Sequence, residues 1–151
     1  MRRILNIPLL LLTLFTLFSC SQEDDTEEIF VGKTWYIDGA IINGKRLNDE
    51  VKNFYTDAGE GAYYISFSYT TFQGVLSSGA TFAGTWEADG KQQTITFKIT
   101  DKPNTTSTFD KQIYNIISTP SSYSSGADFL HLSKDNDNIL YLSTSRSKVY
   151  N

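Results

Sequence analysis

Apolar and polar side chains alternate along most of this chain, which is the pattern of strands with one buried face. The clearest case is segment 62–70, where Tyr63, Ile65, Phe67 and Tyr69 fall on one face. Segment 71–76 either continues this strand or begins a new one after a bend. The same pattern predicts further strands at 33–42, 80–88, 92–100, 128–133 and 138–144.

Turn residues separate these strands. Asn43-Gly44 and Asp89-Gly90 are typical of tight turns, and the second predicts a two-residue hairpin connection. Segment 134–138 predicts the turn between the last two strands, and the Ser-rich segment 121–126 predicts a loop.

Two segments instead have helical spacing. Segment 48–57 can be capped by Asn48 and ended by Gly59. Segment 108–118 can be capped by Ser107, with Asp110 at the capping-box position, and ended by Pro120. Its apolar face comprises Phe109, Ile113, Ile116 and Ile117. The chain is therefore predicted to be all-β with two short helices, as an antiparallel meander of about six to eight strands in a barrel or sandwich.

The N-terminus resembles the leader of a bacterial lipoprotein. Arg2-Arg3 precedes an apolar stretch densest at 9–18, which is too short to span a membrane and is typical of a signal peptide. It ends in Leu17-Phe18-Ser19-Cys20, which resembles a lipobox. The resemblance implies that residues 1–19 are removed and that Cys20 carries the lipid; an ordinary secretory signal is the alternative.

The residues after Cys20 are strongly acidic. Segment 23–28 carries five Asp or Glu side chains, so we expect residues 20–29 to form a disordered, solvated tether to a domain at 30–151. An acidic cluster at this place resembles the export signal of surface-exposed outer-membrane lipoproteins, and a periplasm-facing position is the alternative. From Phe30 onward acidic and basic residues are nearly balanced, so we expect no nucleic-acid partner.

Two fragments, 32–35 (GKTW) and 84–97 (GTWEADGKQQTITF), are similar to small lipocalin-like bacterial lipoproteins of unassigned function. The resemblance covers about residues 30–143. It implies a lipocalin-like meander barrel and names no ligand.

The chain has little of the chemistry that enzymes need. One Cys, assigned to the lipid, and one His, His131, leave no thiol nucleophile and exclude the common Cys/His zinc sites. We expect His131 to be a structural or exposed strand residue. We predict no catalytic residue, no metal and no cofactor, although Glu87 and Asp89 keep a hydrolase as the least favoured alternative.

The abundant aromatic residues remain, at 10 Phe, 9 Tyr and 2 Trp. Our first hypothesis is a lipid-anchored envelope module that binds a small apolar ligand in the barrel. The alternative is a surface protein that contacts a glycan or a partner lipoprotein through exposed aromatics, with Tyr64, Tyr123 and Tyr141 as candidates. Packing in an ordinary core is a third interpretation. The residues expected to line a cavity are Trp35, Phe67, Tyr69, Phe82, Trp86 and Phe97.

Overall fold

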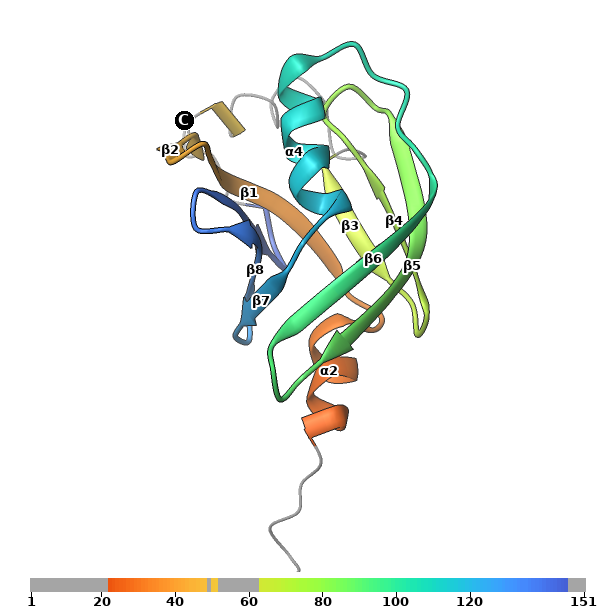
Figure 1. Cartoon of the computed structure of the whole chain (residues 1–151). Helices are drawn as coiled ribbons and strands as arrows, with labels where there is room; N and C mark the ends of the chain where they lie inside the picture. Colours follow the sequence, from red (N-terminus) through yellow and green to blue (C-terminus); the bar gives the residue numbers. More distant parts are fainter. Residues whose placement is uncertain (1–21, 49, 52–62, 147–151) are drawn as a thin grey trace, which may run out of the picture.

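A nearly closed antiparallel barrel forms the body of the protein, seen here in a computed structural model that describes residues 22–48, 50–51 and 63–146 (Figure 1). Its eight strands follow the order β6-β5-β4-β3-β1-β9-β8-β7, and β2 pairs only with β1. The strands are β1 (Thr34–Ile42), β2 (Lys45–Arg46), β3 (Tyr64–Phe67), β4 (Thr71–Val75), β5 (Thr81–Asp89), β6 (Thr94–Asp101), β7 (Ser122–Ser125), β8 (Phe129–Asp135) and β9 (Asn138–Ser143). The predicted all-β meander barrel with two short helices is confirmed.

The barrel closes on one side and stays open on the other. β1 pairs with both β3 and β9, so the first strand joins the last. β6 and β7 are not paired along their length, but the amide of Tyr123 donates to the carbonyl of Gln93 at 2.9 Å. Helix α4 (Thr108–Ser118) connects these two strands and buries Ile113, Ile116 and Ile117. The helix therefore supplies apolar side chains where the sheet is incomplete.

The start of α4 confirms the predicted cap but not the whole capping box. The Ser107 hydroxyl accepts from the Asp110 amide at 3.2 Å. The fully buried Asp110 carboxylate does not return to Ser107; it accepts from the Ser77 hydroxyl at 2.5 Å and from the Ser78 amide at 3.0 Å. A buried carboxylate requires such donors. Asp110 thereby ties the helix to the turn between β4 and β5.

The acidic segment differs from the prediction of a disordered tether. Residues Gln22–Phe30 form helix α2 at one end of the barrel (Figure 1). Phe30 is fully buried, with ring centroids 5.1 Å from Phe67, 4.9 Å from Trp86 and 5.1 Å from Tyr123. Glu27 and Glu28 of this helix are exposed, whereas its last residue, Phe30, is a core residue. The chain from Gln22 to Phe30 is therefore helical rather than disordered.

Other local predictions fail where pairing overrides composition. Segment 121–126 contains strand β7 rather than a loop only, because it pairs with β8 from Ser122↔Ser133 to Ser125↔Leu130. The turn at Asp89-Gly90 has four residues between paired Asp89 and Thr94, not two. The Asp89 carboxylate accepts from the amides of Lys91 and Gln92, at 2.9 and 3.1 Å, and supports this longer turn.

The remaining predictions agree with the structure where it describes them. β4 is a new strand after a bend. In the turn between β8 and β9, the side-chain amide of Asn138 donates a hydrogen bond to the Asp135 carboxylate at 2.8 Å. That bond lowers the pKa of the exposed Asp135 carboxyl. Of the helix predicted at 48–57, Asn48, Glu50 and Val51 are helical, and the rest lies outside the described residues.

Candidate functional site

Five of the six aromatic residues predicted to line a cavity lie in the barrel interior. Their exposed fractions are 0% for Trp35, 3% for Phe67, 1% for Phe82, 8% for Trp86 and 7% for Phe97. The sixth, Tyr69, is 72% exposed, because β3 ends at Phe67 and the alternation does not continue into the bend. The expectation that Tyr69 shares this inner face is wrong.

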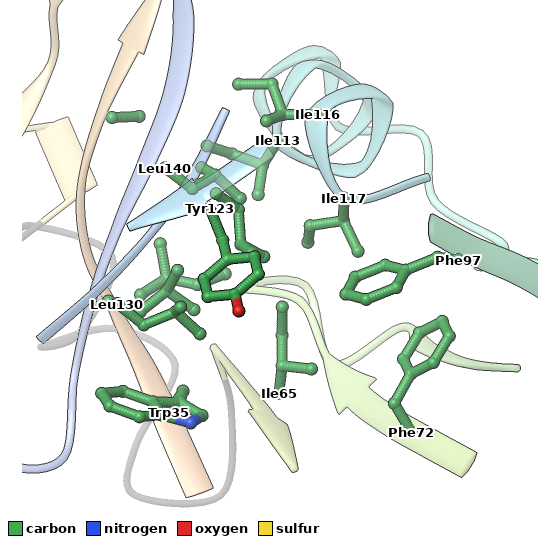
Figure 2. Packing of buried hydrophobic residues seen from close by; sticks show 14 of the residues in the cluster. Trp35, Ile65, Phe72, Phe97, Ile113, Ile116, Ile117, Tyr123, Leu130 and Leu140 are labelled. Atoms are coloured by element: carbon green, nitrogen blue, oxygen red, sulfur yellow. The ribbon is translucent and has the colours of Figure 1, made fainter. Parts of the chain in front are cut away.

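These interior rings pack against one another. Phe72 stacks on Phe97 with centroids 4.5 Å apart, and Phe67 lies 5.4 Å from Trp86. Trp86 also donates its indole Nε1–H to the carbonyl of Ser68 at 2.8 Å. Figure 2 shows Tyr123 between Leu130, Ile65 and the isoleucines of α4, in the middle of the same cluster. The interior is filled by side chains, which favours the core interpretation over an open cavity.

Trp35 lies at one side of this cluster, on β1 (Figure 2). Its Nε1 is buried and has no hydrogen-bond partner among the described residues. The ammonium of Lys33 lies 5.7 Å from its ring centroid, within cation–π range. Packing and one cation therefore hold this indole.

A second group of aromatic side chains lies on the outside of the barrel. We call it the outer aromatic face; it consists of Tyr36 on β1, Tyr64 on β3, Phe129 and His131 on β8, and Tyr141 on β9. The register brings it together, since His131 pairs with Tyr141 and Tyr36 pairs with Tyr64. Phe129 is 44% exposed and the other four are half-buried.

The rings of this face contact one another and two arginines. The His131 ring centroid lies 4.9 Å from Phe129 and 4.6 Å from Tyr141. The guanidinium carbon of Arg46 lies 5.9 Å from the Tyr141 ring, and that of Arg146 lies 5.0 Å from the Tyr36 ring. The arginines could not be found from local sequence, because β2 and the segment after β9 meet the tyrosines only in the folded barrel.

His131 has the environment of a half-buried strand residue, as predicted. Its Nδ1 lies 3.3 Å from the Ser124 hydroxyl, and burial lowers the pKa of its imidazole. Glu87 and Asp89, the two carboxylates considered for a hydrolase, are exposed on β5, and Asp89 serves its turn.

Of the three tyrosines predicted to be exposed, Tyr64 and Tyr141 belong to the outer aromatic face. Tyr123 is only 5% exposed and points into the barrel, which corrects its assignment. Its inward direction follows from the strand in segment 121–126, where the sequence predicts a loop.

Clefts of similar size open at two places on the described part of the surface. One, of about 330 Å³, lies at the end of the barrel between α2 and the β7–β8 connection, where Glu28, Lys33 and Ser125 line it. The other, of about 340 Å³, is a shallow hollow on the outside of β3, β4, β5 and β6. We call it the polar trough; its lining comprises Ser66, Phe67, Ser68, Thr71, Phe72, Gln73, Ala83, Gly84 and Thr100. The sequence shows only that Ser66, Gln73 and Thr100 are polar residues next to core residues, and it does not show that they lie together.

Within the described ranges, no three His, Cys, Asp or Glu side chains gather as metal ligands. No helix that the structure describes is both long and apolar enough to cross a bilayer.

Comparison with known proteins identifies a family and a fold. The family described as "Domain of unknown function (DUF4847)" matches residues 21–145. A crystal structure of a DUF4847 family protein from Bacteroides vulgatus ATCC 8482 is similar, with a TM-score of 0.66 and 21% identity over 82% of this chain and 99% of that chain. No curated protein matches the sequence. The comparisons agree with the barrel and do not test the resemblance to lipocalin-like lipoproteins.

Proposed function

The chain belongs to the DUF4847 family, and we propose that it is a lipid-anchored binding module of the cell envelope that holds a glycan on the outside of its barrel. The observation that supports this most is the division of its aromatic residues. The inner ones fill the core, whereas the outer aromatic face remains accessible. The outer face is thus favoured over the small apolar ligand that the sequence first suggested.

The composition of the outer aromatic face suits a sugar better than an apolar ligand. A sugar ring presents C–H groups on its faces and hydroxyls at its edge, so it stacks on aromatic rings and needs hydrogen bonds beside them. Phe129 and Tyr141 supply rings, and Ser124, His131 and Arg46 supply polar groups within the same area.

The anchor is part of the proposal. Cys20 carries the lipid, residues 1–19 are removed, and the domain sits at the outer membrane, facing the cell surface, with the periplasmic side as the alternative. In this proposal the protein is not an enzyme, uses no cofactor and binds no nucleic acid.

Glycan binding is tested with Phe129→Ala and Tyr141→Ala combined. Electrophoresis of the folded domain in gels containing neutral or anionic polysaccharides should show retardation by at least one of them. The double variant should lose about tenfold or more in affinity, because stacking contributes about 1 kcal/mol per ring. Glu87→Ala, at an exposed position on β5, is the control and should bind normally. Retention of full affinity by the double variant, or no binding by any polysaccharide, contradicts the proposal.

The anchor is tested separately by mass spectrometry of the mature protein. We expect an acylated Cys20 at the new N-terminus and a soluble or uncleaved product from Cys20→Ala. An unmodified Cys20 in the wild-type protein would refute the membrane attachment without affecting the glycan proposal.

A further inference from the structure

The polar trough lies directly beside the outer aromatic face. Strand register places Ser66, Gln73 and Ala83 side by side across β3, β4 and β5. On β3, Tyr64 is two residues before Ser66 and therefore on the same side of the sheet. A tyrosine of the outer aromatic face thus borders the trough, so the two features form one continuous surface.

Small residues create the hollow. Ala83 is the outward residue of β5 in this row, its partner on β6 is Asp101, and the register shifts between Ala83 and Gly84. The backbones of β5 and β6 approach closely at Gly84, where any side chain would meet the backbone carbonyl of Lys98. The shift leaves Thr100 beside Ala83, whose carbonyl accepts from the Thr100 hydroxyl at 3.3 Å. The trough is therefore built into the strand pairing rather than into a loop.

Five of the nine lining residues are polar, and two of the others, Phe67 and Phe72, are phenylalanines. The polar side chains offer hydroxyls from Ser66, Ser68, Thr71 and Thr100 and an amide from Gln73, each able to donate and to accept. None of the nine lining residues has an ionisable side chain. Such a surface matches a ligand that is itself rich in hydroxyls, and it has no cation to compensate a sulfate, phosphate or carboxylate.

We propose that the polar trough is a subsite for an uncharged glycan, with one sugar in the hollow and a neighbouring sugar against Tyr64. This inference rests on the proposed function and adds the ligand class and the place. Tyr64 is positioned for this by its pairing with Tyr36, whose ring centroid lies 6.4 Å away.

The experiment uses the full mature domain and two sets of soluble polysaccharides. Dextran, mannan and xylan are the neutral probes, and polygalacturonate and chondroitin sulfate are the anionic probes. We expect a neutral probe to bind. Ala83→Arg should weaken that binding by about tenfold or more because it fills the hollow, and Gln73→Ala by about threefold because it removes one hydrogen-bonding group.

Thr96→Arg is the matched control, since it adds the same charge at an exposed position on β6 outside the trough. It should bind like the wild-type protein, and circular dichroism should show that all variants are folded. If Ala83→Arg unfolds the domain, Gln73→Ala and Tyr64→Ala, both outside the core, carry the test.

The outcomes separate the two proposals. Binding of anionic probes alone overturns the uncharged ligand, and neutral binding that survives Ala83→Arg and Gln73→Ala overturns the trough; in both cases glycan binding by the module still stands. Binding by no probe overturns both.

Discussion

The inside and the outside of this barrel use the same aromatic residue types in opposite ways. Inside, Phe67, Phe72 and Phe97 pack ring against ring, with at most 7% of any of the three exposed. Outside, Phe129 keeps 44% of its surface exposed. The inner rings are almost completely covered by other side chains, whereas the outer rings are half-buried or exposed.

This difference teaches where a ligand can bind. A filled interior gains its stability from contacts that a ligand would have to displace, and well-packed cores resist insertion. A half-exposed ring retains unused contact area and costs little to cover. The same contrast predicts how mutations at the two places should behave.

The largest expected effect is inside the barrel. Trp86→Ala should lower the free energy of unfolding by about 3–5 kcal/mol, because it leaves a cavity beside Phe30 and Phe67 and removes the bond to the Ser68 carbonyl. Phe97→Ala should cost a similar amount. Denaturant unfolding measures both, and losses near 1 kcal/mol at both positions would instead indicate an open cavity.

Helix α2 tests how far the interior extends. Phe30→Ala should cost about 3 kcal/mol, since its ring closes one end of the barrel against Phe67, Trp86 and Tyr123. Glu27→Ala, an exposed position of the same helix, should stay within about 0.5 kcal/mol. If Phe30→Ala and Glu27→Ala both change Tm only slightly, α2 does not stabilise the barrel and acts only as a tether.

On the outside of the barrel, we expect a mutation to weaken glycan binding while lowering stability only slightly. Tyr141→Ala should cost about 1 kcal/mol or less, from its contacts with His131 and Arg46, while weakening glycan binding. Unfolding and gel-retardation measurements on the same preparation check this. A loss as large as that of Trp86→Ala would mean that the outer face is also structural.

The smallest expected effect is a dependence on pH through His131. Burial lowers its pKa in the folded state, so below pH about 6.5 the unfolded chain takes up a proton first and stability falls until the folded-state pKa is passed. Above that range His131 is neutral in both states and contributes nothing. His131→Gln should therefore lose less stability than the wild-type protein between pH about 7.5 and 5.5 in denaturant unfolding. An identical pH profile would show that this imidazole is not buried.

Local sequence was sufficient for the features that neighbouring residues determine. Alternation identifies the strands around Ile65, Phe82 and Ile95, because a pleated chain places every second side chain on one face. The Ser107 cap and the end of α4 were also predictable, since the groups that form them lie within a few residues of one another.

Tertiary structure alone decided which of these faces meet and how closely. Alternation cannot tell whether Phe72 and Phe97 line an empty barrel or stack across a filled one, because that depends on the distance between strands remote in sequence. β7 exists because β8 pairs with it, and this pairing turns Tyr123 inward. Phe30 becomes part of the core because the end of the barrel offers it three rings. The polar trough arises in the same way, from the register of four strands whose outward residues gave no joint signal.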